Sequence, residues 1–168
     1  MSELRTAVLL VATVSTGLVA GLFYAYACSV MPGLGRSGDR TFVEAMQRIN
    51  VAILNGWFAV CFAGAPLATG AAAVLHLGGG RPALPWTVAA FALYAVVLVV
   101  TFRVNVPLND ALAAAGEVDR AAGLAAVRER FEARWVRWNT VRTVAAAASF
   151  ACLAWALVLH GRLAQAAG

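Results

Sequence analysis

Four long apolar runs constrain this sequence more than any other feature. They cover residues 4–30, 50–77, 86–103 and 140–160. The hydrocarbon core of a bilayer is about 30 Å thick and needs roughly 20 apolar residues in a helix to cross it. Apolar residues make up 62% of the chain and charged residues 12%, whereas soluble domains average about 25% charged. The sequence therefore predicts an all-α fold, an antiparallel four-helix bundle integral to a membrane, as one domain over residues 1–168.

The connections between the runs predict which face is cytoplasmic. Two long loops, 32–48 and 104–138, fall on one face of such a bundle, and the short turn 78–85 falls on the other. All 13 basic residues are arginine, and most lie at the face with the long loops. The positive-inside rule places those loops in the cytoplasm and both termini outside. The Ala-, Gly- and Arg-rich composition is typical of a bacterial protein, so we expect the inner (plasma) membrane and its lipid bilayer. The net charge of +5 is spread along the membrane boundaries, and we expect no nucleic-acid partner.

Several local signals predict where helices begin and end. The stretch Met31–Gly35 should end the first helix, because it contains Pro and Gly. Thr41 and Glu44 fit a capping box, so we expect a helix to start there and to run on into the second apolar run. Asn55 lies inside that run, where its amide should need a partner on another helix.

Small residues recur at every fourth position of the first run, at Thr13, Gly17, Gly21 and Ala25. Such a ridge lets another helix approach closely. The approaching helix is either another part of this chain or a second copy, so the face of Gly17 and Gly21 is also a candidate for a homo-oligomer contact.

A polar stretch interrupts the end of the third run, where Arg103, Asn105, Pro107 and Asn109 occur close together. A cation near a membrane boundary is costly unless it snorkels, pairs or lines a cavity, so its presence indicates a functional site. Pro107 disfavours helical geometry in the residue before it and donates no backbone hydrogen bond. We therefore expect the helix to end or kink here.

A second polar cluster lies where the fourth run begins. Trp135, Trp138, Asn139 and Arg142 are spaced to share one helical face. Two indole rings beside an amide and a guanidinium suit a flat, partly anionic aromatic ligand, although an interfacial tryptophan belt with a snorkelling arginine is the alternative. We expect Arg103 and Arg142 to lie at matching depth and to meet an anionic ligand or a carboxylate. The candidate carboxylates are Glu44, Asp110 and Glu132.

The remaining candidates have two interpretations each. Gln47 and Asn50 share a helical face and serve either as a site or as hydrogen-bonding links between helices. Tyr24 belongs either to an aromatic belt or to a cavity. His76 and His160 end the second and fourth runs, on the face opposite the Asn/Arg cluster. A metal- or haem-dependent redox centre there is an alternative, but no third ligand accompanies them, and we predict no metal site.

The chain resembles the anthrone-oxygenase-like family of small four-helix membrane proteins. The residues that carry the resemblance are Phe23-Tyr-Ala-Tyr26 with Met31-Pro-Gly33, Gln47-Arg-Ile-Asn50, Asn105-Val-Pro-Leu-Asn109 and Trp135-Val-Arg-Trp-Asn-Thr-Val-Arg142. The resemblance implies a membrane-embedded monooxygenase of aromatic polyketide chemistry. Such an enzyme oxidises a flat anthrone-type or polyphenolic substrate with O₂ to a quinone, without a cofactor.

The resemblance and the clusters together assign a role to each candidate residue. The residues expected to act on the substrate anion are Arg103, Asn105, Asn109, Asn139 and Arg142. The residues expected to bind the substrate are Tyr24, Gln47, Asn50, Trp135 and Trp138. Glu44, Asp110 or the substrate's own phenolate would serve as the base. The main alternative is a non-catalytic membrane protein that binds or transports a small molecule or lipid.

Overall fold

The computed structural model describes residues 2–78, 82–118 and 123–166, which form helices and short connections and contain no strand. Two π-helical turns, η1 and η2, interrupt the α-helices. The elements in order are α1 (Ser2–Ala25), η1 (Tyr26–Val30), α2 (Met31–Gly35), α3 (Asp39–Ala52), α4 (Gly56–Leu77), α5 (Leu84–Val100), η2 (Thr101–Asn105), α6 (Val106–Ala113) and α7 (Leu124–Ala166).

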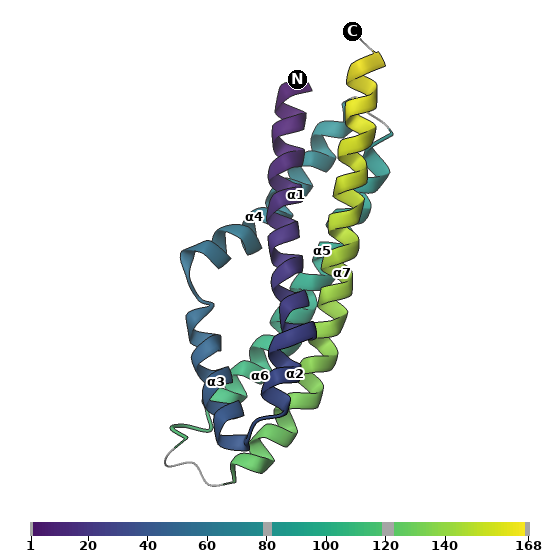
Figure 1. Cartoon of the computed structure of the whole chain (residues 1–168). Helices are drawn as coiled ribbons and strands as arrows, with labels where there is room; N and C mark the ends of the chain where they lie inside the picture. Colours follow the sequence, from purple (N-terminus) through teal and green to yellow (C-terminus); the bar gives the residue numbers. More distant parts are fainter. Residues whose placement is uncertain (1, 79–81, 119–122, 167–168) are drawn as a thin grey trace.

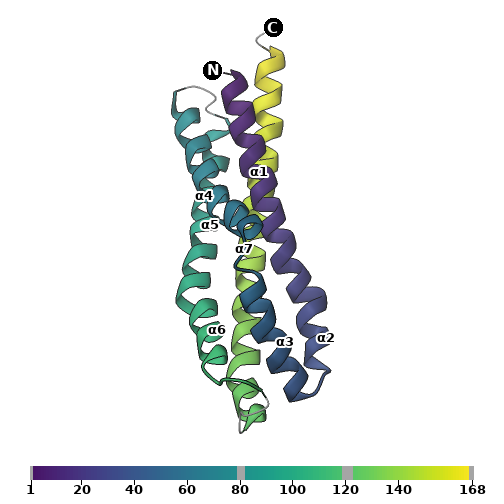
Figure 2. The same ribbon diagram turned by 90° about the vertical axis from the view of Figure 1, so that its left-hand side faces the viewer.

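The helices form an elongated bundle with both termini at one end (Figure 1). The chain runs away from that end along α1 and α2, returns through α3 and α4, runs away again through α5 and α6, and returns along α7. Figure 2 shows α2, α3, α6 and the first turns of α7 gathered at the end opposite the termini. The spans that could cross a membrane are Glu3–Gly35, Gly56–Leu77, Leu84–Ala113 and Leu124–Arg162. The predicted all-α membrane fold is confirmed.

The described parts of the predicted loops 32–48 and 104–138 are largely helical. Helix α7 has 43 residues and is roughly 65 Å long at 1.5 Å per residue, about twice the thickness of a hydrocarbon core. One end of α7 therefore projects beyond the apolar layer. There it packs with α2, α3 and α6 around buried Phe42, Met46, Leu112 and Phe131.

Both π turns precede a proline at the start of the next helix, Pro32 in α2 and Pro107 in α6. The amide of Met31 donates to the Tyr26 carbonyl, and the amide of Val106 donates to the Thr101 carbonyl. Each hydrogen bond spans five residues, so the turn is wider than an α-turn. A widened turn accommodates the proline ring, which would clash with the carbonyl four residues earlier in an α-helix. The helices continue past both prolines, and the first span ends at Gly35, inside the stretch Met31–Gly35 that was predicted to terminate it.

The expected continuous helix from Thr41 into the second span is wrong, because α3 ends at Ala52 and α4 begins at Gly56. Helix α3 begins at Asp39 after Gly38, without a side-chain cap, and Glu44 pairs with Arg48 (2.7 Å) in place of a capping box. The chain breaks after α3, and Asn55 caps α4 by accepting a hydrogen bond from the Phe58 amide (3.0 Å). A capping amide satisfies the free amides at a helix start, so Asn55 needs no partner on another helix.

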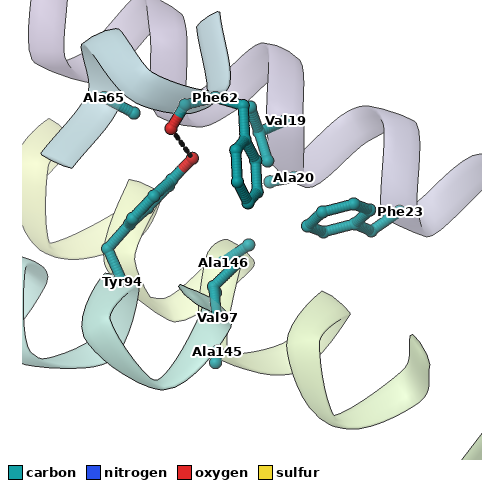
Figure 3. Packing of buried hydrophobic residues seen from close by; sticks show 9 residues of the cluster. All are labelled: Val19, Ala20, Phe23, Phe62, Ala65, Tyr94, Val97, Ala145 and Ala146. Atoms are coloured by element: carbon teal, nitrogen blue, oxygen red, sulfur yellow. Dashed lines mark hydrogen bonds between the residues drawn. The ribbon is translucent and has the colours of Figure 1, made fainter. Parts of the chain in front are cut away.

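The middle of the bundle contains a hydrogen bond that compensates for a proline. Pro66 lies inside α4 and cannot donate to the carbonyl of Phe62, four residues earlier. The buried Tyr94 hydroxyl donates to that carbonyl instead, at 3.0 Å. Figure 3 shows this bond among the side chains of Val19, Phe23, Phe62, Val97 and Ala146.

The small-residue ridge of α1 is used within the chain at one of its glycines. A Cβ atom at Gly17 would lie 2.9 Å from the Phe150 ring of α7, whereas one at Gly21 would meet nothing within 4 Å. Gly17 therefore permits close packing of α1 on α7. Only Gly21 of this pair stays open to an oligomer contact, which remains a prediction.

Candidate functional site

A cavity of about 240 Å³ is lined by residues of α1, η1, α3, the start of α4, η2, α6 and α7. Its lining is mostly apolar, with aromatic and polar side chains set into it. The aromatic residues are Phe23, Tyr26, Phe58 and Trp135, and the polar residues are Gln47, Asn50, Thr101, Asn105, Asn109, Asp110 and Arg142. Such a lining, apolar with a few polar groups, is typical of small-molecule sites.

Arg142 is the cation of this cavity, and its residue exposure is only 7%. The Cζ atom lies 4.1 Å from the centroid of the Phe23 ring and 5.1 Å from that of Trp135. Its Nε donates to Asn139 Oδ1 at 3.0 Å. Among the described residues, the Nη atoms have no hydrogen-bond partner and no carboxylate forms an ion pair with Arg142. A buried charge without a counterion is costly, so this guanidinium is suited to an anionic ligand.

Asn139 holds Arg142 in place without lining the cavity. Its side chain is almost fully buried, and its Nδ2 donates to the Phe23 carbonyl of α1 at 3.2 Å. The same amide therefore fixes α7 to α1 and orients the Arg142 guanidinium. Asn139 is a positioning residue, which differs from its expected direct contact with the substrate.

Unpartnered polar atoms gather around the same cavity. Thr101 Oγ1, Asn105 Oδ1 and Asn50 Nδ2 are buried without a hydrogen-bond partner among the described residues. Each buried polar atom left unpaired costs about 1–3 kcal/mol. Thr101 and Asn105 are the first and last residues of η2, and π turns are often found at functional sites. The cluster provides a donor, an acceptor and a hydroxyl to a bound molecule.

Trp135 forms one wall of the cavity, and two amides hold it there. Its Nε1 donates to Asn109 Oδ1 at 2.8 Å, and Asn105 Nδ2 lies 3.4 Å from its carbonyl oxygen. The Tyr26 ring centroid lies 5.6 Å from that of Trp135.

Gln47 connects α3 to the end of α6. Its side-chain amide donates to the carbonyls of Leu112 (2.9 Å) and Gly116 (3.1 Å).

Six of the ten predicted site residues line the cavity: Gln47, Asn50, Asn105, Asn109, Trp135 and Arg142. The other four, Arg103, Tyr24, Trp138 and Asn139, do not. Arg103 is exposed because it is two residues from both Thr101 and Asn105 and so lies on the opposite side of the helix. Two arginines at matching depth around one ligand are therefore not observed. Tyr24 is 62% exposed, which agrees with a position in an aromatic belt.

Four of the aromatic and polar side chains in the cavity lining are not among the predicted site residues or candidate bases: Phe23, Tyr26, Phe58 and Thr101. A sequence signal was present for three of them, because Thr101 precedes Asn105 by one helical turn and Tyr26 follows Phe23 by nearly one. Asp110 also lines the cavity, whereas Glu44 pairs with Arg48 outside it.

The two histidines meet at the other end of the bundle. Their ring centroids are 5.5 Å apart. His76 Nδ1 donates to the Ala72 carbonyl (2.7 Å), and His160 Nε2 lies 3.1 Å from Thr6 Oγ1. No group of three or more metal-ligating side chains occurs within the described ranges. The histidine pair is separate from the Arg142 cavity.

Comparison with known proteins places the cavity residues of η2, α6 and α7 in one recognised segment. The family model for anthrone oxygenase matches residues 57–152, which is more than half of the chain. This segment includes Thr101, Asn105, Trp135 and Arg142. No curated protein and no solved structure matches the chain.

Proposed function

Because the chain belongs to the anthrone oxygenase family, we propose that it oxidises the methylene carbon of a flat anthrone-type or polyphenolic substrate to a quinone with O₂. The observation that carries this proposal is Arg142, a buried guanidinium stacked on Phe23 and Trp135 without a carboxylate partner among the described residues. A cation between aromatic rings fits a substrate that is flat, apolar and anionic when it reacts.

The role of the cavity is to lower the free energy of the substrate anion. Removal of a proton from the methylene carbon leaves a delocalised enolate whose oxygen carries negative charge. The Nη donors of Arg142 form strong charge-assisted hydrogen bonds to such an oxygen. Preorganised donors in a site of low polarity are an effective source of catalysis. Asn50 Nδ2 supplies a further donor.

Two chemical steps then balance with O₂ as the only oxidant. The enolate transfers one electron to O₂, and the resulting radicals combine to form a carbon–oxygen bond and a peroxide, which takes up a proton. Loss of the second methylene proton and cleavage of the O–O bond give the new carbonyl and water. Asp110 is the carboxylate at the cavity, and we assign it the first proton transfer.

The cavity size limits the substrate. Its volume of about 240 Å³ is slightly below the roughly 300–1,000 Å³ that is usual for drug-sized ligands. Exposed apolar Val51 and Leu54 lie on its rim, so a lipophilic substrate dissolved in the bilayer can reach it. The substrate should therefore be a compact polycyclic phenol.

The test is turnover of an anthrone under air by the detergent-purified protein, with O₂ uptake and quinone formation measured together. Wild type should exceed the uncatalysed rate, and Arg142→Gln should lose roughly 100-fold or more of that excess. Arg137→Gln is the matched control, because Arg137 is an exposed residue of the same helix outside the cavity. Anthrone binding without turnover would support a small-molecule binder instead. Stoichiometric haem or metal in the purified protein would favour a redox centre at His76 and His160.

We also propose that the protein lies in a bacterial inner membrane with the α2/α3/α6 end in the cytoplasm. The arginines that support this orientation lie around the described part of that end, and they include Arg36, Arg40, Arg48, Arg128, Arg130, Arg134 and Arg137. Reporter fusions at each terminus test the orientation. Both termini should report an external location.

A further inference from the structure

A second hollow lies on the other side of α6, between that helix and the first turns of α7. Its volume is about 580 Å³, and it shares no lining residue with the Arg142 cavity. Its apolar lining includes Leu108, Leu112, Val127 and Phe131, and two arginines, Arg130 and Arg134, complete it. The hollow is therefore a groove with apolar walls and a cationic edge.

Neither of the two arginines is paired with a carboxylate among the described residues. Both are exposed and lie one helical turn apart. Arg130 Nε donates to the Ala126 carbonyl at 3.1 Å, and neither arginine forms an ion pair within the described part of the chain. Like charges at this spacing repel one another. Arg48 of α3 and Arg128 of α7, in contrast, are paired with carboxylates.

The groove also lies at the level where lipid headgroups are expected. Its arginines belong to the early, arginine-rich part of α7, and the apolar run of the same helix begins a few residues later. The length of α7 carries this early part out of the hydrocarbon layer. An amphiphile lying here would place a charged group against the arginines and would direct an acyl chain past Leu108, which is the apolar lining residue closest in the chain to the membrane span of α5.

We propose that this groove binds an anionic phospholipid, with the headgroup phosphate held between Arg130 and Arg134. Guanidinium groups bind phosphate through paired, charge-assisted hydrogen bonds. The apolar walls select a lipid over free phosphate, because an inorganic ion would make no use of them. This proposal does not depend on the reaction at the Arg142 cavity.

The test is native mass spectrometry of the full chain titrated with phosphatidylglycerol, phosphatidylcholine or inorganic phosphate. Wild type should retain phosphatidylglycerol in preference to phosphatidylcholine and should not retain phosphate. The double variant Arg130→Gln/Arg134→Gln should bind phosphatidylglycerol roughly 10- to 30-fold more weakly, given about 1 kcal/mol for each arginine near an anionic lipid.

A matched control distinguishes a groove from diffuse surface charge. Arg36→Gln/Arg137→Gln removes the same charge from exposed positions outside the groove and should change the affinity less than about threefold. An equal loss in both double variants would overturn the proposal, as would unchanged binding in Arg130→Gln/Arg134→Gln. Retention of phosphate as strong as that of lipid would also overturn it. Equal melting temperatures of the two variants in phosphatidylcholine would show that folding is not the cause.

Discussion

Arg128 and Arg142 lie on the same helix, and each stacks on a phenylalanine ring, yet their surroundings differ. Arg128 donates to Glu132 (2.6 Å), Asp39 (3.0 Å) and the carbonyls of Ser37 and Gly35 (both 2.8 Å). Arg142 donates only to Asn139 among the described residues, although it is the more buried of the two. The difference separates an arginine that holds the fold from one whose guanidinium the proposed function assigns to the substrate.

The comparison teaches that burial alone does not identify a site. Arg128 has enough partners to fix the turn between α2 and α3 against α7, so its charge is fully used. Arg142 lies beside further polar atoms that have no described partner, at Thr101, Asn105 and Asn50. Unsatisfied groups gathered from several helices around one hollow are costly without a ligand, and this concentration is the stronger indication of function.

The first prediction concerns variants that give Arg142 a carboxylate partner of the kind that Arg128 has. Asn139→Asp places a carboxylate on the Arg142 guanidinium, where it competes with the substrate anion, so turnover should fall roughly 100-fold. Asn139→Ala removes the positioning bond but leaves the charge unpaired, and its loss should be nearer tenfold. Anthrone oxidation rates and substrate affinity, measured for both variants, test the difference. Equal activity of the two variants would mean that the free charge of Arg142 is not what matters.

The second prediction concerns the arginine that holds the fold. Arg128→Gln should lower the free energy of unfolding by about 2 kcal/mol, because it leaves two carboxylates and two carbonyls without their donor. Unfolding in a mild detergent, followed by circular dichroism, measures this. Arg48→Gln is the control, since the exposed Arg48–Glu44 pair should contribute only about 0.3–0.5 kcal/mol. A loss for Arg128→Gln no larger than the control would contradict the assigned role.

The third prediction concerns the hydrogen-bond donor of a backbone carbonyl, that of Phe62. Tyr94→Phe should destabilise the protein by about 1 kcal/mol, because the Phe62 carbonyl then has neither Tyr94 nor an amide at Pro66. In a Pro66→Ala background the amide returns, and the same change at Tyr94 should cost clearly less. A double-mutant cycle by thermal unfolding gives the coupling. Additive effects would show that the hydroxyl does not replace the missing amide.

The smallest effect is expected at Arg103. Its side chain is exposed and outside the cavity lining, so Arg103→Ala should change anthrone turnover less than about twofold, within the range of surface substitutions. Steady-state kinetics of this variant beside Arg142→Gln provides the comparison. A large loss of turnover at Arg103 would restore the two-arginine site that the sequence suggested and would move the site toward the opposite face of η2.

Local patterns were sufficient to predict part of the site. Helical spacing placed Trp135, Trp138, Asn139 and Arg142 on one face of a helix. Trp135 and Arg142 line the cavity and Asn139 bonds to Arg142, whereas Trp138 is not in the lining. The same reasoning failed for Arg103, since the face of a helix that meets its neighbours cannot be read from a polar stretch alone. It also failed at Asn55, because an amide in an apolar run has the same sequence signature whether it links two helices or caps one.

The sequence by itself determined the membrane class, the helical content and the four spans, since hydropathy and length depend only on neighbouring residues. It also determined the family, because the family model matches the sequence without any use of the fold. Only the tertiary structure decided that α1 and α5 continue through π turns, that α3 and α4 separate at Asn55, and that Arg128 is paired while Arg142 is not. These outcomes depend on which groups distant segments bring within hydrogen-bonding distance, and no local pattern contains that information.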